Sequence, residues 1–152
     1  KADALGFNVL YYDPYVESTE FTKIDTLNEM LTMADILSIH CPSNDNTRNM
    51  ITDQEIDLLK NTSYIINTAR GDIVSKRSII NALNSGRLGG AGLDVVQDEP
   101  LKTFDEAKTP NLICTCHSAF YSKEAIIDMR TKSATLAKES ILDQPLYNIV
   151  NK

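Results

Sequence analysis

This chain of 152 residues is poor in cysteine and in basic residues, and it lacks any long apolar run. No run approaches the roughly 20 apolar residues of a membrane-spanning helix, and no signal-peptide pattern opens the chain. Three cysteines are too few, and odd in number, for a disulfide framework, which favours a reducing compartment. The formal net charge of −6 disfavours nucleic acid as a partner. We therefore expect a cytoplasmic protein whose partners are neither membranes nor nucleic acids.

Metal ligands are scarce as well. The chain has two histidines, His40 and His117, and the sequence places Cys114 and Cys116 on one face of an expected strand. The spacing of these four residues fits no zinc-ligand pattern. We therefore expect no metal site.

Short apolar runs predict the secondary structure. Strands are expected over residues 8–12, 35–40, 63–67, 90–95 and 111–115, and their nearly continuous apolar character is typical of strands buried on both faces. Helices are expected over residues 25–34, 52–60 and 75–84, with a capping box at Thr52 and a stop at Gly86. This alternation predicts one α/β domain with a parallel, doubly wound sheet. A long amphipathic helix is expected over residues 122–142.

A glycine-rich turn between a first strand and a first helix is missing. Doubly wound nucleotide-binding domains normally open with that turn. This chain instead opens with what reads as the last turn of a helix, which stops at Gly6 and runs into a strand. We therefore expect a Rossmann-like sheet that is incomplete at its N-terminal end, in the C-terminal part of a longer protein.

The residues that follow each predicted strand lie at the sheet edge where ligands of parallel sheets bind, and most of them are polar or charged. In chain order they are Asp13; His40, Cys41 and Pro42; Thr68, Ala69 and Arg70; Asp94 and Glu99; and His117. Asp13 could accept both hydroxyls of a ribose, or it could be a turn-forming residue before Pro14.

Arg70, Glu99 and His117 form the most informative set among these residues. Arg70 presents a planar fork suited to a substrate carboxylate, and His117 can exchange a proton with a hydroxyl or carbonyl group. Glu99 could fix the tautomer of His117. Each residue also has a structural interpretation: an ion pair between Arg70 and Glu99, a solvated acid, and a histidine satisfied by backbone. Together the three meet the needs of reducing a 2-keto acid.

Three ordered segments carry a resemblance to a known family. They are "NTARGDIV" (67–74), "GAGLDVVQDEPL" (90–101) and "NLICTCHSAFYS" (111–122). They resemble the D-isomer-specific 2-hydroxyacid dehydrogenases, a family that also includes the C-terminal-binding-protein corepressors. "FNVLYYDPY" and "ADILSIHCPSNDNTRNMI" resemble the second and third strands of that family's NAD-binding domain.

The resemblance implies a role for each matching residue. Arg70 would bind the substrate carboxylate, His117 would donate the proton, and Glu99 would pair with His117. The residues implied to line the cofactor NAD are Asp13, Cys41, Pro42, Thr47, Thr68, Ala69, Arg70, Asp94, His117, Ser118 and Ala119. Asp13 would favour NAD over NADP, since its carboxylate repels a 2′-phosphate. The implied substrate is a small 2-hydroxy or 2-keto acid, and the implied assembly is a homodimer.

Two departures from the family limit what the resemblance implies. Cys116 stands where the family usually has proline. The larger departure is that the resemblance leaves the glycine-rich turn and most of the substrate domain to be expected upstream of Lys1. We expect residues 1–121 to form a partial dinucleotide-binding domain and residues 122–152 to return toward the substrate domain. Two alternatives stay open: an NAD(H)-sensing binding module of the corepressor type, and an inactive truncated core. The chain alone is expected to be inactive.

Overall fold

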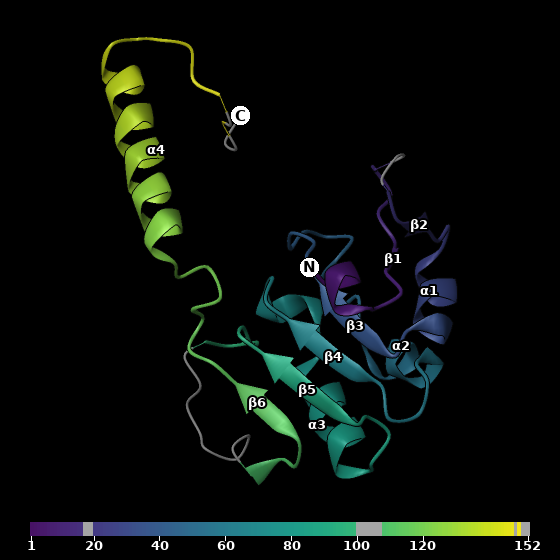
Figure 1. Ribbon diagram of the computed structural model, residues 1–152. Helices are drawn as coiled ribbons and strands as arrows, with labels where there is room; N and C mark the ends of the chain where they lie inside the picture. Colours follow the sequence, from purple (N-terminus) through teal and green to yellow (C-terminus); the bar gives the residue numbers. More distant parts are fainter. Residues whose placement is uncertain (17–19, 100–107, 148, 150–152) are drawn as a thin grey trace. The chain divides into compact units, whose positions relative to one another are not determined.

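The computed structural model describes residues 1–16, 20–99, 108–147 and 149. These residues form two compact units, Lys1–His117 and Ser118–Lys152. All the strands and the shorter helices belong to the first unit, and one long helix belongs to the second (Figure 1).

The first unit holds two parallel sheets. Its strands are β1 (Leu10–Tyr11), β2 (Thr22–Lys23), β3 (Ile36–Ile39), β4 (Tyr64–Asn67), β5 (Gly90–Leu93) and β6 (Leu112–Cys114). β1 pairs with β2, whereas the larger sheet has the order β3-β4-β5-β6 with its arrows pointing the same way (Figure 1). Among the described residues no pairing joins β1 to β3, which agrees with the prediction of an incomplete sheet.

The five predicted strands and the parallel Rossmann-like α/β class are confirmed, although each strand is shorter than expected. β2 was not predicted, because two residues with polar side chains leave no apolar signal. Cys116 lies beyond the end of β6, so the prediction that it shares a strand face with Cys114 is wrong.

The predicted helices are confirmed and their starts are capped by side chains. They are α1 (Leu27–Met33), α2 (Asp53–Leu58), α3 (Lys76–Asn84) and α4 (Lys123–Ile141), with two short 3₁₀ turns, η1 (Asp3–Leu5) and η2 (Gly71–Ile73). Hydroxyls of Thr26, Ser75 and Ser122 accept backbone N–H groups at the starts of α1, α3 and α4. The capping box of α2 is present. Gly6 ends η1, and both Gly6 and Gly86 have positive φ, the conformation that favours glycine.

The larger sheet is buried on one face only. Leu37, Ile65 and Leu93 from that face join a core with helix residues such as Leu31, Ile56 and Ile79. On the opposite face Ile36, Tyr64 and Ile113 are 47%, 50% and 69% exposed. The prediction of strands buried on both faces is therefore wrong for the described residues. The apolar runs place side chains on both faces of the sheet, but the described residues cover only one of them.

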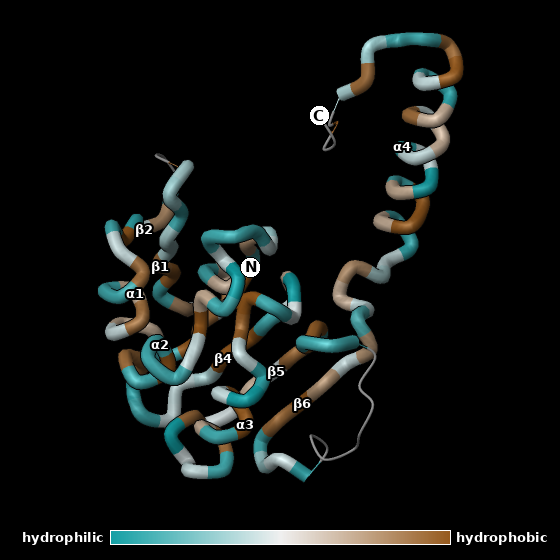
Figure 2. The backbone as a smooth tube through the Cα atoms, turned by 180° about the vertical axis from the view of Figure 1, so that it is seen from behind, coloured by the Kyte–Doolittle hydropathy of each residue, from teal (hydrophilic) through white to brown (hydrophobic). Residues whose placement is uncertain are grey.

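The second unit is built around α4. Hydrophobic and hydrophilic positions alternate along it (Figure 2), and it buries none of its residues. Over the described part of the chain, no helix has the length and apolar character needed to cross a membrane.

Candidate active site

Arg70 leaves the sheet immediately after β4, in a turn held by its neighbours. The side chain of Asn67 accepts the Ala69 N–H at 3.0 Å and donates to the Arg70 carbonyl at 2.9 Å. The Arg70 guanidinium is exposed and donates through Nη1 to the Ala69 carbonyl at 2.7 Å. No described carboxylate pairs with it, so the alternative interpretation of Arg70, a structural ion pair with Glu99, is not what the described residues show.

Gly71 brings this turn against the loop that follows β5. A Cβ atom on Gly71 would lie 2.1 Å from the Val96 carbonyl oxygen and 2.7 Å from the Gln97 nitrogen. Real Cβ atoms are not found at such distances from backbone, so only glycine permits this approach. The close contact places Arg70 next to the segment that carries Glu99.

Glu99 joins His117 to the loop after β5. His117 Nδ1 lies 2.8 Å from Glu99 Oε2, and Glu99 Oε1 accepts the Val96 N–H at 2.8 Å. The two side chains are 46% and 33% exposed, so the pair stands at the surface of a cavity rather than in the core. This contact is the one that the sequence interpretation expected for a tautomer-fixing acid.

Competing effects set the pKa of Glu99. Burial raises the pKa, but the hydrogen bonds from His117 and Val96 and the charge of His117 together outweigh burial and the repulsion from Asp94. The net result is a pKa below the ordinary value, which keeps this carboxylate ionised opposite His117.

One open cavity of about 380 Å³ is lined by all three residues of the predicted catalytic set. Its lining is Arg70, Gly71, Asp72, Val96, Gln97, Asp98, Glu99 and His117. His117 and Asp98 both have positive φ, 55° and 62°. Such backbone is uncommon for residues other than glycine and clusters at functional sites. A cation, an acid and an imidazole thus share one open cavity.

Asp94 lies at the edge of this region and is held firmly. It is 7% exposed, and Thr115 donates its hydroxyl to Asp94 Oδ1 at 2.5 Å. The Asp94 N–H also bonds the Asn67 carbonyl at 2.9 Å. A buried carboxylate therefore sits at the end of β5, between the ends of β4 and β6.

The loop after β3 carries other residues predicted to line a cofactor. The Thr47 hydroxyl donates to the Pro42 carbonyl at 2.7 Å, which closes the loop on itself. Burial is the main cause that raises the pKa of the Cys41 thiol; a backbone hydrogen bond lowers it, and the charge of Asp13 raises it further. The influence of Asp13 on Cys41 indicates that the ends of β1 and β3 lie near each other.

Asp13 adopts the turn that the sequence interpretation left open. Its Oδ1 accepts the N–H groups of Tyr15 and Val16 at 2.8 and 3.2 Å. Asp13 does not line the cavity of Arg70 and His117. Thr68 and Ala69 precede Arg70 in the turn after β4, while Ser118 and Ala119 open the second unit.

Hydrogen bonds between loops were not expected from the sequence. Ser43 donates to Asp72 Oδ2 at 2.7 Å, and Gln97 Nε2 donates to Asn49 Oδ1 at 3.0 Å. The Asn49 N–H bonds the Asp72 carbonyl at 2.7 Å. The loops after β3, β4 and β5 are thus joined to one another. The polar residues inside the motif segments were the only sequence signal for these hydrogen bonds. The spacing of residues along the chain does not show which loops such bonds connect.

Among the described residues, no group of three or more His, Cys, Asp or Glu side chains could hold a metal ion. The titratable and charged groups that line the cavity are Arg70, Asp72, Asp98, Glu99 and His117.

Comparison with known proteins identifies the family. Residues 1–119 match the family described as "D-isomer specific 2-hydroxyacid dehydrogenase, NAD binding domain". The chain belongs to this family. Glycerate dehydrogenase of Methylorubrum extorquens is 39% identical over 129 residues, which are 83% of this chain and 40% of that protein. D-3-phosphoglycerate dehydrogenase of Methanocaldococcus jannaschii is 32% identical over 99% of this chain and 30% of its own length.

Solved structures of family members have the same fold. The NAD-complexed D-isomer specific 2-hydroxyacid dehydrogenase of Lactobacillus delbrueckii ssp. bulgaricus matches with a TM-score of 0.82 and 32% identity, covering 98% of this chain and 50% of that one. The chain thus spans half or less of the length of these relatives. The predicted recognition, the Rossmann-like class and NAD as the family's cofactor are confirmed.

Proposed function

We propose that the protein containing this chain interconverts a D-2-hydroxy acid and its 2-keto acid with NAD. The observation that carries the proposal is the hydrogen bond between Glu99 and His117 in the same cavity as Arg70. Family membership supports the reaction class, and the relatives' names, glycerate and D-3-phosphoglycerate dehydrogenase, support a small hydroxy acid.

His117 is proposed to move the proton. Its Nδ1 faces Glu99, so Nε2 is the ring atom left to face a substrate. In reduction, Nε2 gives a proton to the keto oxygen, and in oxidation it takes the proton of the hydroxyl. The ionised Glu99 stabilises the positive charge on the imidazole whenever the ring holds both protons.

Arg70 is proposed to bind the substrate carboxylate. Its guanidinium is exposed at the cavity, with a backbone carbonyl as its described partner, so its remaining N–H groups are available to an anion. A fork of parallel N–H donors binds a carboxylate in a fixed orientation. Arg70 thereby sets the carbonyl of the substrate toward His117.

The residues at the strand ends are proposed to hold NAD. Asp13 would bind the adenosine ribose through Oδ2, since Oδ1 already accepts two backbone N–H groups. The residues proposed to border the remainder are Cys41, Pro42, Thr47, Thr68, Ala69, Arg70, Asp94, His117, Ser118 and Ala119. When bound, NAD would accept a hydride from substrate C2, or NADH would donate one to it. This chain would orient the substrate and transfer the proton. Asp94, buried and held by Thr115, fits a group that accepts hydrogen bonds from a carboxamide.

A cytoplasmic homodimer is our proposal for the whole protein, and residues 122–152 are proposed to return toward its substrate domain. The corepressor-type alternative would bind NAD(H) without turnover. The intact pair of His117 and Glu99 favours the enzyme, because a binding module needs no proton donor.

The test is turnover by the full-length gene product. NADH oxidation would be followed with pyruvate, glyoxylate, hydroxypyruvate and phosphohydroxypyruvate, and the reverse reaction with the D- and L-isomers of lactate, glycerate and 3-phosphoglycerate. We expect activity with at least one keto acid and with the D-isomer alone. NADH binding by a folded protein that turns over none of these acids would contradict the proposal and favour the corepressor-type module.

A further inference from the structure

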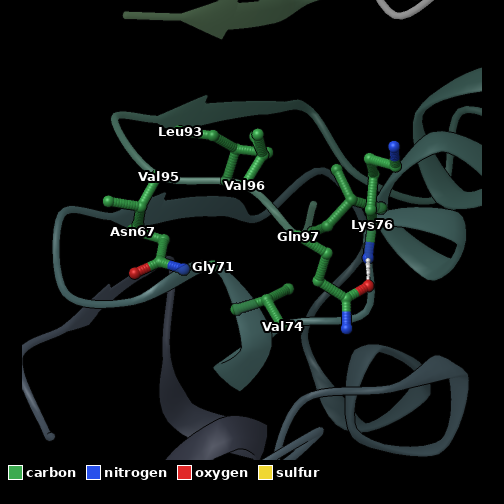
Figure 3. A pocket seen from close by; sticks show the side chains of 9 residues that line it. Asn67, Gly71, Val74, Lys76, Leu93, Val95, Val96 and Gln97 are labelled. Carbon is green, nitrogen blue, oxygen red and sulfur yellow. Dashed lines mark hydrogen bonds between the residues drawn. The ribbon is translucent and has the colours of Figure 1, made fainter. Parts of the chain in front are cut away.

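The side chain of Asn67 is polar and almost fully buried. It is 1% exposed at the end of β4, while its strand neighbours Ile65 and Leu93 belong to the apolar core. Figure 3 shows the amide beside Gly71, in a small cavity lined also by Val95 and Val96. A buried amide costs free energy unless its hydrogen bonds are made, so its partners indicate what it does.

Both ends of the amide are used on the turn that follows. Oδ1 accepts the Ala69 N–H at 3.0 Å, and Nδ2 donates to the Arg70 carbonyl at 2.9 Å. These backbone groups point into a turn rather than a ladder. One side chain therefore closes the turn that carries Arg70.

The same contacts reach the guanidinium. Arg70 Nη1 donates to the carbonyl of Ala69, whose N–H is the group that Asn67 holds. Among the described residues, the exposed guanidinium has no other hydrogen-bond or ion-pair partner. Its position at the cavity depends on the backbone of residues 67–70. Asn67 holds that backbone through the Ala69 N–H and the Arg70 carbonyl.

We propose that Asn67 is a positioning residue for Arg70: it holds the turn after β4 in the shape that aims the guanidinium at the substrate carboxylate. The inference rests on the proposed role of Arg70. A positioning group acts through geometry, so losing it weakens the binding of the carboxylate while the proton transfer by His117 continues.

Two variants remove the contacts in steps. Asn67→Asp keeps the acceptor for Ala69 but, when ionised, has no donor for Arg70. Asn67→Leu keeps a similar volume and removes both bonds. Ser63→Ala is the matched control, since Ser63, directly before β4, is 2% exposed and donates to the Ala34 carbonyl at 2.9 Å. It removes a buried hydrogen bond at the opposite end of β4 from the turn.

Steady-state kinetics of the full-length protein are the first measurement. We expect KM for the keto acid to rise about tenfold in Asn67→Asp and further in Asn67→Leu, with kcat within about threefold. KM for NADH should change by less than about threefold in both, and Ser63→Ala should leave all three values near wild type. An unchanged keto-acid KM in both Asn67 variants, or an equal rise in Ser63→Ala, would overturn the proposal.

A second measurement does not depend on turnover. Hydrogen exchange of the Ala69 amide, and binding of oxamate (a keto-acid analogue that is not reduced), would be followed by NMR in the same proteins. We expect faster exchange of this amide in Asn67→Leu and weaker oxamate binding in both Asn67 variants. If the wild type neither turns over keto acids nor binds oxamate, the proposed function fails. The exchange rate of the Ala69 amide would still test whether Asn67 holds the turn. An Ala69 amide that exchanges as in wild type would refute the role of Asn67 even in an active enzyme.

Discussion

His117 is held in place by Glu99, whose second carboxylate oxygen is itself fixed by the Val96 N–H. The imidazole orientation therefore depends on the loop after β5, although His117 follows β6. Two strand ends must be correctly placed before the proposed proton transfer can occur.

Replacement of His117 by alanine should lower turnover. We expect kcat for keto-acid reduction in the full-length protein to fall about 10²- to 10⁴-fold, because the proton donor is lost. KM for the keto acid should change much less, since Arg70 remains. Wild-type kcat in this variant would exclude His117 as the proton donor.

Arg70→Ala should act mainly on substrate binding. We expect the keto-acid KM to rise about 100-fold or more, as a charged pair to the substrate carboxylate is removed. Arg70→Lys keeps the charge but loses the planar fork, so it should recover only part of the affinity. Steady-state kinetics over a wide range of keto-acid concentrations would measure both. Equal KM values in the wild type and Arg70→Ala would assign the carboxylate to another group.

The lowered pKa of Glu99 predicts how stability responds to acid. Because the folded pKa lies below the ordinary value of 4.5, the contribution of this carboxylate is complete above about pH 4.5 and is lost as the pH falls through the folded pKa. Glu99→Gln should therefore be less stable than wild type near neutral pH, and the gap should narrow toward pH 3. Urea unfolding at several pH values would measure it, and a constant gap would contradict the prediction.

Gly71→Ala should damage the fold and the site together. The added Cβ would meet the Val96 carbonyl oxygen at 2.1 Å, and backbone cannot move aside cheaply. We expect a loss of about 1–3 kcal/mol in unfolding free energy. Gly92→Ala is the matched control, since its Cβ would meet only the end of the Ile66 side chain, at 3.1 Å. Chemical unfolding of both variants gives the comparison, and equal losses would contradict the close-approach explanation.

Arg87 should contribute to stability through the end of α2. Its guanidinium donates to the carbonyls of Ile56, Leu59 and Lys60, at and just beyond the C-terminal end of α2, where carbonyls lack the i+4 partners of the helix interior. Arg87→Ala should cost about 1–3 kcal/mol, because these carbonyls lose a charged donor.

The control for Arg87 is an exposed arginine with an ion pair. Arg77 lies 3.7 Å from Asp53, and its side chain is 81% exposed. Arg77→Ala should therefore change the unfolding free energy by less than about 1 kcal/mol. Urea unfolding measures both variants. Similar losses of unfolding free energy would show that the burial of the Arg87 contacts does not determine their contribution to stability.

The sequence predicted the elements of the fold well because apolar runs and capping residues act locally. The apolar stretches around Ile65 and Leu93 predicted buried strands, and the capping box at Thr52 predicted the start of α2. The open sheet face at Tyr64 and Ile113 could not be foreseen, since the apolar pattern does not reveal whether anything in the chain covers it.

The candidate site was predictable to a similar degree. The sequence predicted Arg70, Glu99 and His117 at one edge of the sheet, because the carboxyl ends of parallel strands lie at the same edge. It left open whether Glu99 pairs with His117 or with Arg70, and it did not reveal that Asn67 holds the turn of Arg70. Those contacts depend on turn shapes and side-chain directions, which no spacing in the sequence encodes.

The hydrogen bonds that join Ser43 to Asp72 and Asn49 to Gln97 have a consequence for binding free energy. They connect the loops after β3, β4 and β5 through protein groups alone. A ligand that enters the cavity therefore meets a preorganised rim and does not have to immobilise three separate loops. Less of its interaction energy is lost to conformational entropy, so a small acid with few contacts can still be held in one orientation.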